Sequence, residues 1–167
     1  MLNKKNVSAG FSLTELIIVM AIAGILMSIA TLAFNNWNLK AQIEKQTREL
    51  LSDANSARTE SLFRKKQHSI VFNEDATGYA FKRYSSENEN MFNGATLYSK
   101  RFSKQMKSKT GTSIADKVLL FDSRGFALFP QTIRVEPMGS GAAFDCVVIS
   151  GSRTNLGQMA GGECVQK

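Results

Sequence analysis

An uncharged and almost wholly apolar run, Leu16–Phe34, most limits how the chain can fold, because its polar side chains are only Ser28 and Thr31. As an α-helix rising about 1.5 Å per residue, residues 11–34 would extend for roughly 36 Å. A hydrocarbon core is about 30 Å thick, so this helix is long enough to cross a membrane. From Asn35 onward the 167-residue chain is polar and mixed. We therefore expect one soluble domain on a single membrane anchor.

A glutamate, Glu15, stands immediately before this run. A carboxylate at membrane depth is costly unless it has a partner, although the N-terminus of a helix favours a negative charge. A free amino group at Phe11 would supply a cation at the same end, so the sequence favours a cut after Gly10. A secretory signal peptide is the alternative, but the "NNWNLKAQ" that follows the run offers no small-x-small cleavage site. Two lysines before the run place this end in the cytoplasm and the domain outside.

The segment "GFSLTELIIVMAIAGIL" resembles the N-terminal signature of type IV pilins and pseudopilins. This resemblance implies a leader of residues 1–10, a membrane and filament-core helix half of residues 11–37, and an extracytoplasmic domain of residues 38–167. It implies that prepilin peptidase cuts between Gly10 and Phe11 and methylates the new amino group of Phe11. It also implies that Glu15 pairs with the N-terminus of an adjacent subunit. A simple anchor with a chance glutamate is the alternative. The helix-breaking proline that many pilins carry in this segment is absent.

Two cysteines, Cys146 and Cys164, lie late in the chain. An even pair in an exported domain favours a disulfide, and closing a loop of this length contributes about 3 kcal/mol in the entropic description. Two unlinked thiols are the alternative. Two cysteines and the single histidine, His68, do not complete a zinc shell, so we expect no metal and no cofactor.

The helix is predicted to continue to about residue 63, because no glycine or proline interrupts residues 27–63. One face follows helical spacing: Ile43, Thr47, Leu50, Ala54, Ala57 and Ser61. Most charged residues are expected elsewhere: Lys45, Arg48, Glu49, Asp53 and Arg58. Beyond the helix, "HSIVFN" and "YAFKRY" predict a hairpin, "KVLLFD" and "FALF" predict a second, and "TIRVE" and "FDCVVIS" predict two more strands. The prediction is an α+β fold, with one long helix packed on an antiparallel β-sheet domain.

A basic stretch between the hairpins, residues 97–110, contains five cations and no acid: Lys100, Arg101, Lys104, Lys107 and Lys109. It is a candidate surface for DNA or another anion, and a solvated strand or variable loop is the alternative. The formal charge is +7 and falls to +5 without Lys4 and Lys5, which permits anionic partners without requiring them.

The later segments "VLLFDSRGFALF" and "CVVISGSRTNLGQMAGGEC" are similar to the H-type minor pseudopilins and their minor-pilin relatives, the GspH/FimT group. Some members of that group bind DNA through a Gly-Arg-x-Arg stretch. This chain offers only Arg153 there, which puts that route in doubt.

Enzyme motifs such as GxSxG, CxxC and HExxH are absent, and His68, after three basic residues, is expected to cap the helix end. We expect a non-enzymatic minor pilin or pseudopilin of the bacterial inner membrane. Its expected partners are prepilin peptidase and other pilins or pseudopilins. A DNA-binding subunit for DNA uptake and a secretion-system tip component that contacts exported proteins are the alternatives. The same helix serves a type IV pilus and a type II secretion pseudopilus, so the sequence leaves both open.

Overall fold

The computed structural model describes residues 11–86, 89–115 and 117–167. The expected leader, with Gly10, lies outside the described residues. The chain divides into two compact units, residues 1–38 and residues 39–167.

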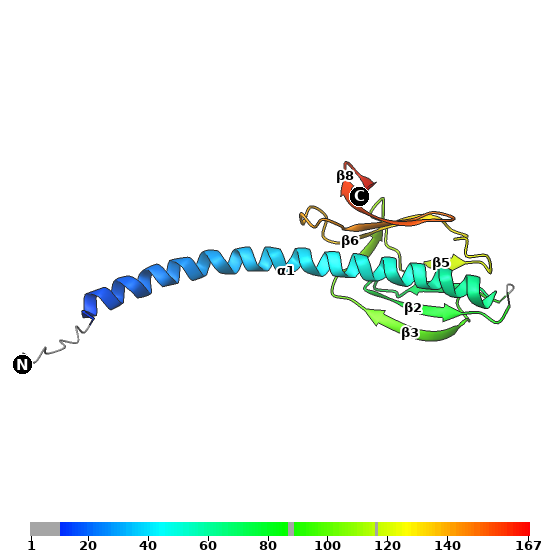
Figure 1. Ribbon diagram of the computed structural model, residues 1–167, viewed down its shortest axis with the longest axis horizontal. Coiled ribbons are helices and arrows are strands. Elements are labelled where there is room, and N and C mark those ends of the chain that lie inside the picture. Colours follow the sequence, from blue (N-terminus) through cyan, green and yellow to red (C-terminus); the bar gives the residue numbers. More distant parts are fainter. Residues whose placement is uncertain (1–10, 87–88, 116) are drawn as a thin grey trace, which may run out of the picture. The chain divides into compact units, whose positions relative to one another are not determined.

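The helix α1 (Leu13–Arg64) has 52 residues and contributes to both units (Figure 1). It begins where Ser12 accepts a backbone hydrogen bond from Leu16, and it ends at Lys65, whose φ is 54°. A left-handed residue just past the last turn is a common way to end a helix. The predicted bounds, 12–63, are therefore confirmed to within one residue at each end.

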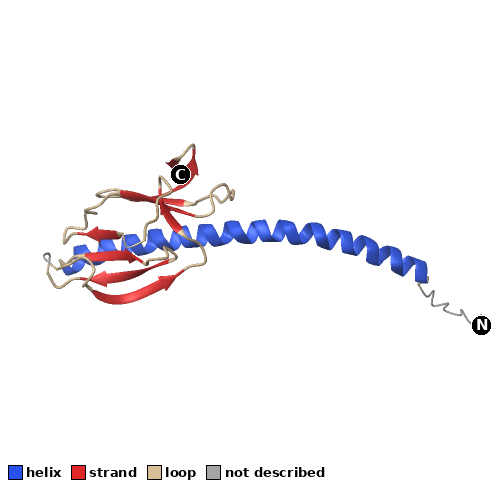
Figure 2. Cartoon of the chain, turned by 180° about the vertical axis from the view of Figure 1, so that it is seen from behind, coloured by secondary structure: helices blue, strands red, loops and turns tan. Residues whose placement is uncertain are grey.

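In the described ranges nine strands follow the helix, whereas the sequence predicted five or six. They are β1 (His68–Phe72), β2 (Gly78–Arg83), β3 (Ala95–Arg101), β4 (Met106–Ser108), β5 (Val118–Phe121), β6 (Gln131–Val135), β7 (Cys146–Ile149), β8 (Thr154–Ala160) and β9 (Glu163–Gln166). They form two antiparallel sheets, in the orders β3-β2-β1-β5 and β4-β6-β7-β8-β9. The α+β class is confirmed (Figure 2).

The first predicted hairpin is confirmed, because β1 and β2 pair with His68 opposite Arg83 and Phe72 opposite Tyr79. The second is confirmed only as an antiparallel turn, in which the Asp122 amide donates to the Phe126 carbonyl. In the described residues, the "FALF" segment makes only an isolated bridge, from Ala127 to Phe121. The Ala127 amide donates to the Gly151 carbonyl and the Leu128 amide to the Leu120 carbonyl. The segment thus divides its backbone hydrogen bonds between two neighbours and does not form a ladder with either one.

One hydrophobic core joins the helix and both sheets in the second unit. The helix face predicted from spacing is confirmed, because all six of its side chains are buried. The first sheet contributes residues such as Ile70 and Phe121, and the second contributes residues such as Ile133 and Val147. Each sheet thus buries one side against the same stretch of helix, which suits the period-two pattern of its strands.

Candidate functional site

The first half of α1 is apolar and exposed. In the described part of the chain, α1 is the one helix that is long and apolar enough to cross a membrane. Its large apolar side chains from Leu16 to Phe34, among them Ile17, Ile25 and Ile29, are all exposed where they are described. A continuous apolar surface of this kind marks contact with a membrane or with other protein.

Glu15 lies in the first turn of α1 and is exposed, and Phe11 just before the helix is 82% exposed. A carboxylate in the first turn is favoured by the partial positive charge at the helix N-terminus. The structure therefore places Glu15 and Phe11 at the same end of the helix. The cut after Gly10, the methylation of Phe11 and the pairing of Glu15 with a neighbouring subunit stay predictions.

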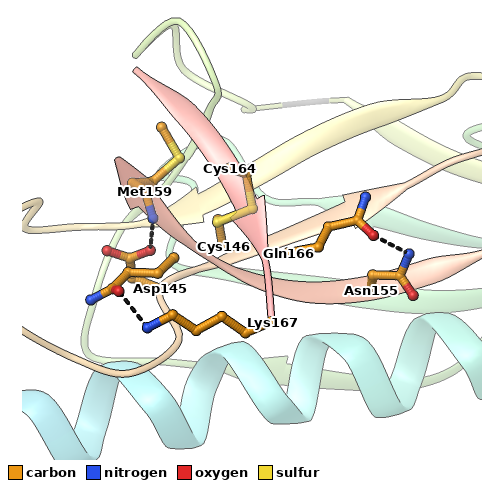
Figure 3. The surroundings of a disulfide bond; sticks show 8 residues. Asp145, Cys146, Asn155, Met159, Cys164, Gln166 and Lys167 are labelled. Atoms are coloured by element: carbon orange, nitrogen blue, oxygen red, sulfur yellow. Dashed lines mark hydrogen bonds between the residues drawn. A yellow bond between two sulfur atoms is a disulfide. The ribbon is translucent and has the colours of Figure 1, made fainter. Parts of the chain in front are cut away.

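The predicted disulfide is confirmed, because Cys146 and Cys164 are bonded (Figure 3). The bond joins β7 to β9 and passes over β8, which lies between them in the sheet. Gly157 of β8 is paired with Cys146 and lies beneath the bond. A Cβ at Gly157 would be 2.6 Å from the Cys164 sulfur and 2.6 Å from the Val165 carbonyl oxygen. A glycine is therefore needed at this crossing.

The basic stretch is two strands, so a loop is the wrong description of most of it. The exposed strand β3 carries Lys100 and Arg101, and β4 carries Lys107. Four of its five cations are paired with carboxylates: Lys100 with Asp53, Arg101 with Asp75, Lys107 with Glu136, and Lys109 with Glu163. Lys104 supplies its carbonyl to the Gln46 amide. The stretch is therefore largely neutralised from within the chain.

Arg153, the other DNA candidate, is exposed in the turn between β7 and β8. That turn joins strands of the second sheet, whereas Lys100 and Arg101 belong to the first. The structure therefore does not gather the candidate residues on one strand or sheet, and DNA binding through them stays a prediction.

A buried polar cluster centres on Asp53, which is only 6% exposed. The sequence predicted instead that Asp53 lies away from the buried face of the helix. The Tyr79 hydroxyl donates to Asp53 at 2.7 Å, and the Lys100 ammonium lies 2.8 Å from the same carboxylate. Burial, and then the hydrogen bond to Asp53, raises the pKa of Tyr79. Burial, and then the Asp53 charge, raises the pKa of Tyr98 to about 12. Both phenols therefore stay neutral. Asp53 follows Leu50 by three residues and precedes Ala57 by four. This helical spacing puts Asp53 beside the buried face and could have predicted its burial.

Arg58 is a second charged side chain whose buried contacts the sequence did not predict. Its guanidinium donates to the carbonyls of Gly125 and Gly151, each at 2.8 Å, and lies over the Phe121 ring at 5.1 Å. Burial lowers the pKa of Arg58. Arg58 thus links α1 to the turns that follow β5 and β7.

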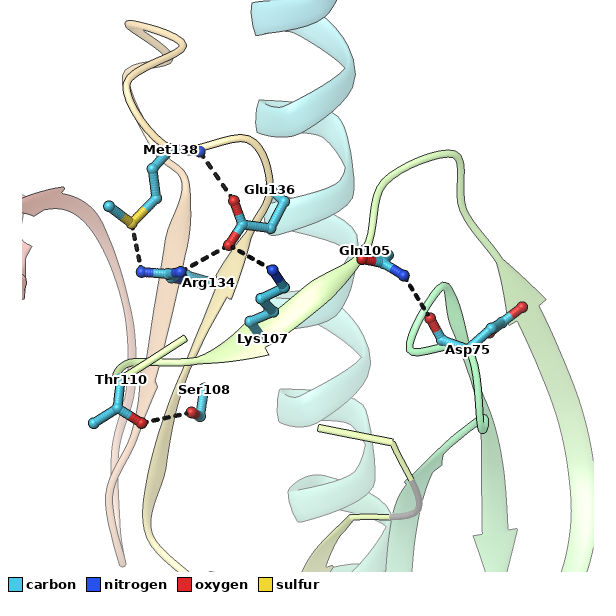
Figure 4. A network of polar contacts seen from close by, with 8 residues as sticks. All are labelled: Asp75, Gln105, Lys107, Ser108, Thr110, Arg134, Glu136 and Met138. Atoms are coloured by element: carbon cyan, nitrogen blue, oxygen red, sulfur yellow. Dashed lines mark hydrogen bonds and ion pairs between the residues drawn. The ribbon is translucent and has the colours of Figure 1, made fainter. Parts of the chain in front are cut away.

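A third polar network lies where β4 meets β6 (Figure 4). Glu136 accepts a hydrogen bond from Arg134 at 2.8 Å and also pairs with Lys107 at 3.7 Å. Arg134 is the more buried of the two cations. Pairing of this kind balances buried charge and leaves little for a ligand.

His68 does not cap the helix as expected, because it lies fully buried in β1. Its Nδ1 lies 3.0 Å from the Lys66 carbonyl, to which it donates as the neutral tautomer. Burial lowers the pKa of His68. In the described ranges, no group of three or more His, Cys, Asp or Glu side chains is placed to hold a metal ion.

Two solved proteins have a similar fold over most of this chain. The type IV minor pilin FimU of Pseudomonas aeruginosa is 15% identical with a TM-score of 0.52, covering 78% of this chain and 98% of its own. The minor pseudopilin EpsH from the Type 2 Secretion System of Vibrio cholerae is 15% identical with a TM-score of 0.52, covering 73% and 99%. The chain has the minor pilin and pseudopilin fold. A second crystal form of FimU, 18% identical with a TM-score of 0.50, agrees over 74% of this pilin-like chain and 98% of its own.

A comparison with family models gives a match to a different kind of protein. The family described as "Lipopolysaccharide export system permease LptF/LptG" matches residues 7–134. That range ends inside β6 and omits β7, β8 and β9, so it divides the second sheet of the pilin-like fold. Apolar helices resemble one another in composition, so we assign the fold from the structural likeness. The comparison with curated proteins found no match.

Proposed function

We propose that this chain is a minor pilin or pseudopilin, a non-enzymatic subunit that moves from the inner membrane into an extracytoplasmic filament. One observation carries the proposal: a globular unit of pilin-like fold follows a helix segment whose apolar side chains are exposed and whose first turn holds Glu15. In the membrane, lipid covers this segment. In a filament, the same segments of neighbouring subunits cover one another.

In this mechanism the N-terminus is cytoplasmic, the domain is periplasmic, and prepilin peptidase cuts between Gly10 and Phe11 and methylates Phe11. Glu15 then accepts the positive amino group of an adjacent subunit. Pairing replaces the hydration that both charges lose when the helices bundle, and breaking such a pair by removing one partner can cost about 3–5 kcal/mol.

The first test is the mass of the mature chain purified from cells that contain the peptidase. We expect the loss of residues 1–10 and the gain of one methyl group. A mature chain that keeps all ten residues would contradict the proposal.

The second test is Glu15→Ala, with Glu74→Ala as the control, because Glu74 is an exposed glutamate in the β1–β2 turn. Glu15→Ala should reach normal membrane levels and keep the stability of the globular unit, yet be lost from sheared filaments. Glu74→Ala should enter filaments normally. Equal entry of Glu15→Ala and the wild type would show that charge pairing does not drive assembly.

A further inference from the structure

A basic pocket lies at the C-terminal end of α1. It is lined by Arg64 of the last helical turn, Lys66 just beyond the helix, and Arg83, Tyr84 and Ser85 at the end of β2. Three cations from three segments of the chain thus meet around one hollow, and all of them belong to the second unit.

The charge balance of this pocket differs from that of the basic stretch on β3 and β4. Arg64 is paired with Glu60. In the described part of the chain, Lys66 and Arg83 have no carboxylate partner, whereas Lys100, Arg101 and Lys107 each have one. Lys66 and Arg83 therefore leave positive charge at this pocket that no ion pair takes up.

The helix dipole is the plain alternative, since cations near a helix C-terminus are stabilising. It accounts for Arg64 but not for Arg83, which comes from a strand.

The rim of the pocket already binds one oxyanion of the chain itself. The Ser85 amide donates to the Glu89 carboxylate at 2.7 Å. That amide is already used, so a ligand would depend on the side-chain cations, of which arginine offers two parallel N–H donors to a phosphate group.

We propose that the pocket of Arg64, Lys66 and Arg83 binds a phosphate group carried by a small ligand. Arg83 is the main donor, Lys66 adds a second charge, and Arg64 stays shared with Glu60. The group belongs either to free phosphate or a monoester, with at most one esterified oxygen, or to a diester phospholipid headgroup, with two.

The test is calorimetric titration of the full chain in a nonionic detergent at low salt. The probes are inorganic phosphate, glycerol phosphate, and glycerophosphoglycerol, a soluble diester with the headgroup chemistry of an anionic lipid. We expect the wild type to bind at least one probe and Arg83→Gln to bind it at least tenfold more weakly. Binding of glycerophosphoglycerol assigns a lipid headgroup, and binding of only the other two probes assigns free phosphate or a monoester.

Three further variants make the test specific. Lys66→Gln should also weaken binding, and Arg83→Lys should keep part of it because the charge remains. Lys45→Gln is the matched control, since Lys45 is an exposed lysine elsewhere on α1. If Arg83→Gln fails to fold, Lys66→Gln decides, because Lys66 is exposed and lies beyond the helix.

The proposal is overturned if the wild type binds none of the three probes at low salt, or if Arg83→Gln and Lys66→Gln bind as tightly as Lys45→Gln. Arg83-dependent binding of a single-stranded oligonucleotide, with none of the small probes bound, would also overturn it in favour of a nucleic-acid backbone.

Discussion

Replacing Gly157 by alanine should destabilise the globular unit through the disulfide crossing. The new Cβ would lie 2.6 Å from the Cys164 sulfur and 2.6 Å from the Val165 carbonyl oxygen. Carbon and its non-bonded neighbours prefer separations of about 3.5–4.0 Å, so β9 must move by roughly 1 Å. The disulfide holds β9 to β7 and resists that movement.

Overpacking of this kind costs about 1–3 kcal/mol, and replacing a glycine returns about 0.5–1 kcal/mol by restricting the unfolded chain. The net loss should be about 1–2 kcal/mol. For a unit of this size, that lowers the melting temperature by roughly 3–10 °C.

The assay is thermal unfolding followed by circular dichroism, with Gly151→Ala as the control. A Cβ at Gly151 would meet nothing within 4 Å, so Gly151→Ala should melt at or slightly above the wild-type temperature. Replacing both cysteines with alanine should shrink the penalty at Gly157, because one of the two close contacts is then gone. Equal melting temperatures for Gly157→Ala and Gly151→Ala would refute the packing argument.

Two more predictions concern the region where α1 meets β1. Lys65→Gly should raise the free energy of unfolding by about 0.5 kcal/mol in urea titrations, because Lys65 holds a left-handed φ of 54° that glycine adopts freely, while Lys65→Ala should not. The folded chain keeps His68 neutral and lowers its pKa, so the unfolded chain binds more protons below about pH 6.5. The stability due to neutral His68 should therefore be complete above that pH and decline as pH falls toward the lowered folded value. His68→Gln should flatten this decline between about pH 7 and 5.5, and an equally steep decline in both proteins would contradict the assignment.

The helix could be predicted because its evidence is local. No glycine or proline interrupts its second half, and the spacing from Ile43 to Ser61 marks one buried face. The hairpin of β1 and β2 was predictable for the same reason, since alternation and a short turn lie within one segment.

The missed strands lacked such a signal. Nearly all of β3 is exposed, so its sequence does not alternate, and β8 is largely half-buried. The segment from Phe126 to Phe129 does alternate partly, yet its amides bond to two different neighbours. Pattern alone therefore predicted a strand where none forms and missed strands held mainly by their backbones.

The polar centres depend on partners far along the chain. Asp53 meets Tyr79 across 26 residues, and Arg58 meets Gly151 across 93. From sequence alone, a charged residue on a helix is predicted to be exposed, because the partner that would allow its burial lies far along the chain. The Cys146–Cys164 pair was predictable because the chain offers only one combination.

The disulfide also decides how a pull on the C-terminus would travel. Cys164 lies three residues before the last residue, and its bond leads directly to β7, which is flanked by β6 and β8. Tension applied at Lys167 therefore reaches an inner strand of the sheet once the pairings of Val165 and Gln166 with β8 are released. Because β7 is paired with β6 on one side and β8 on the other, the hydrogen bonds of two ladders then resist the pull, where an edge strand would have one.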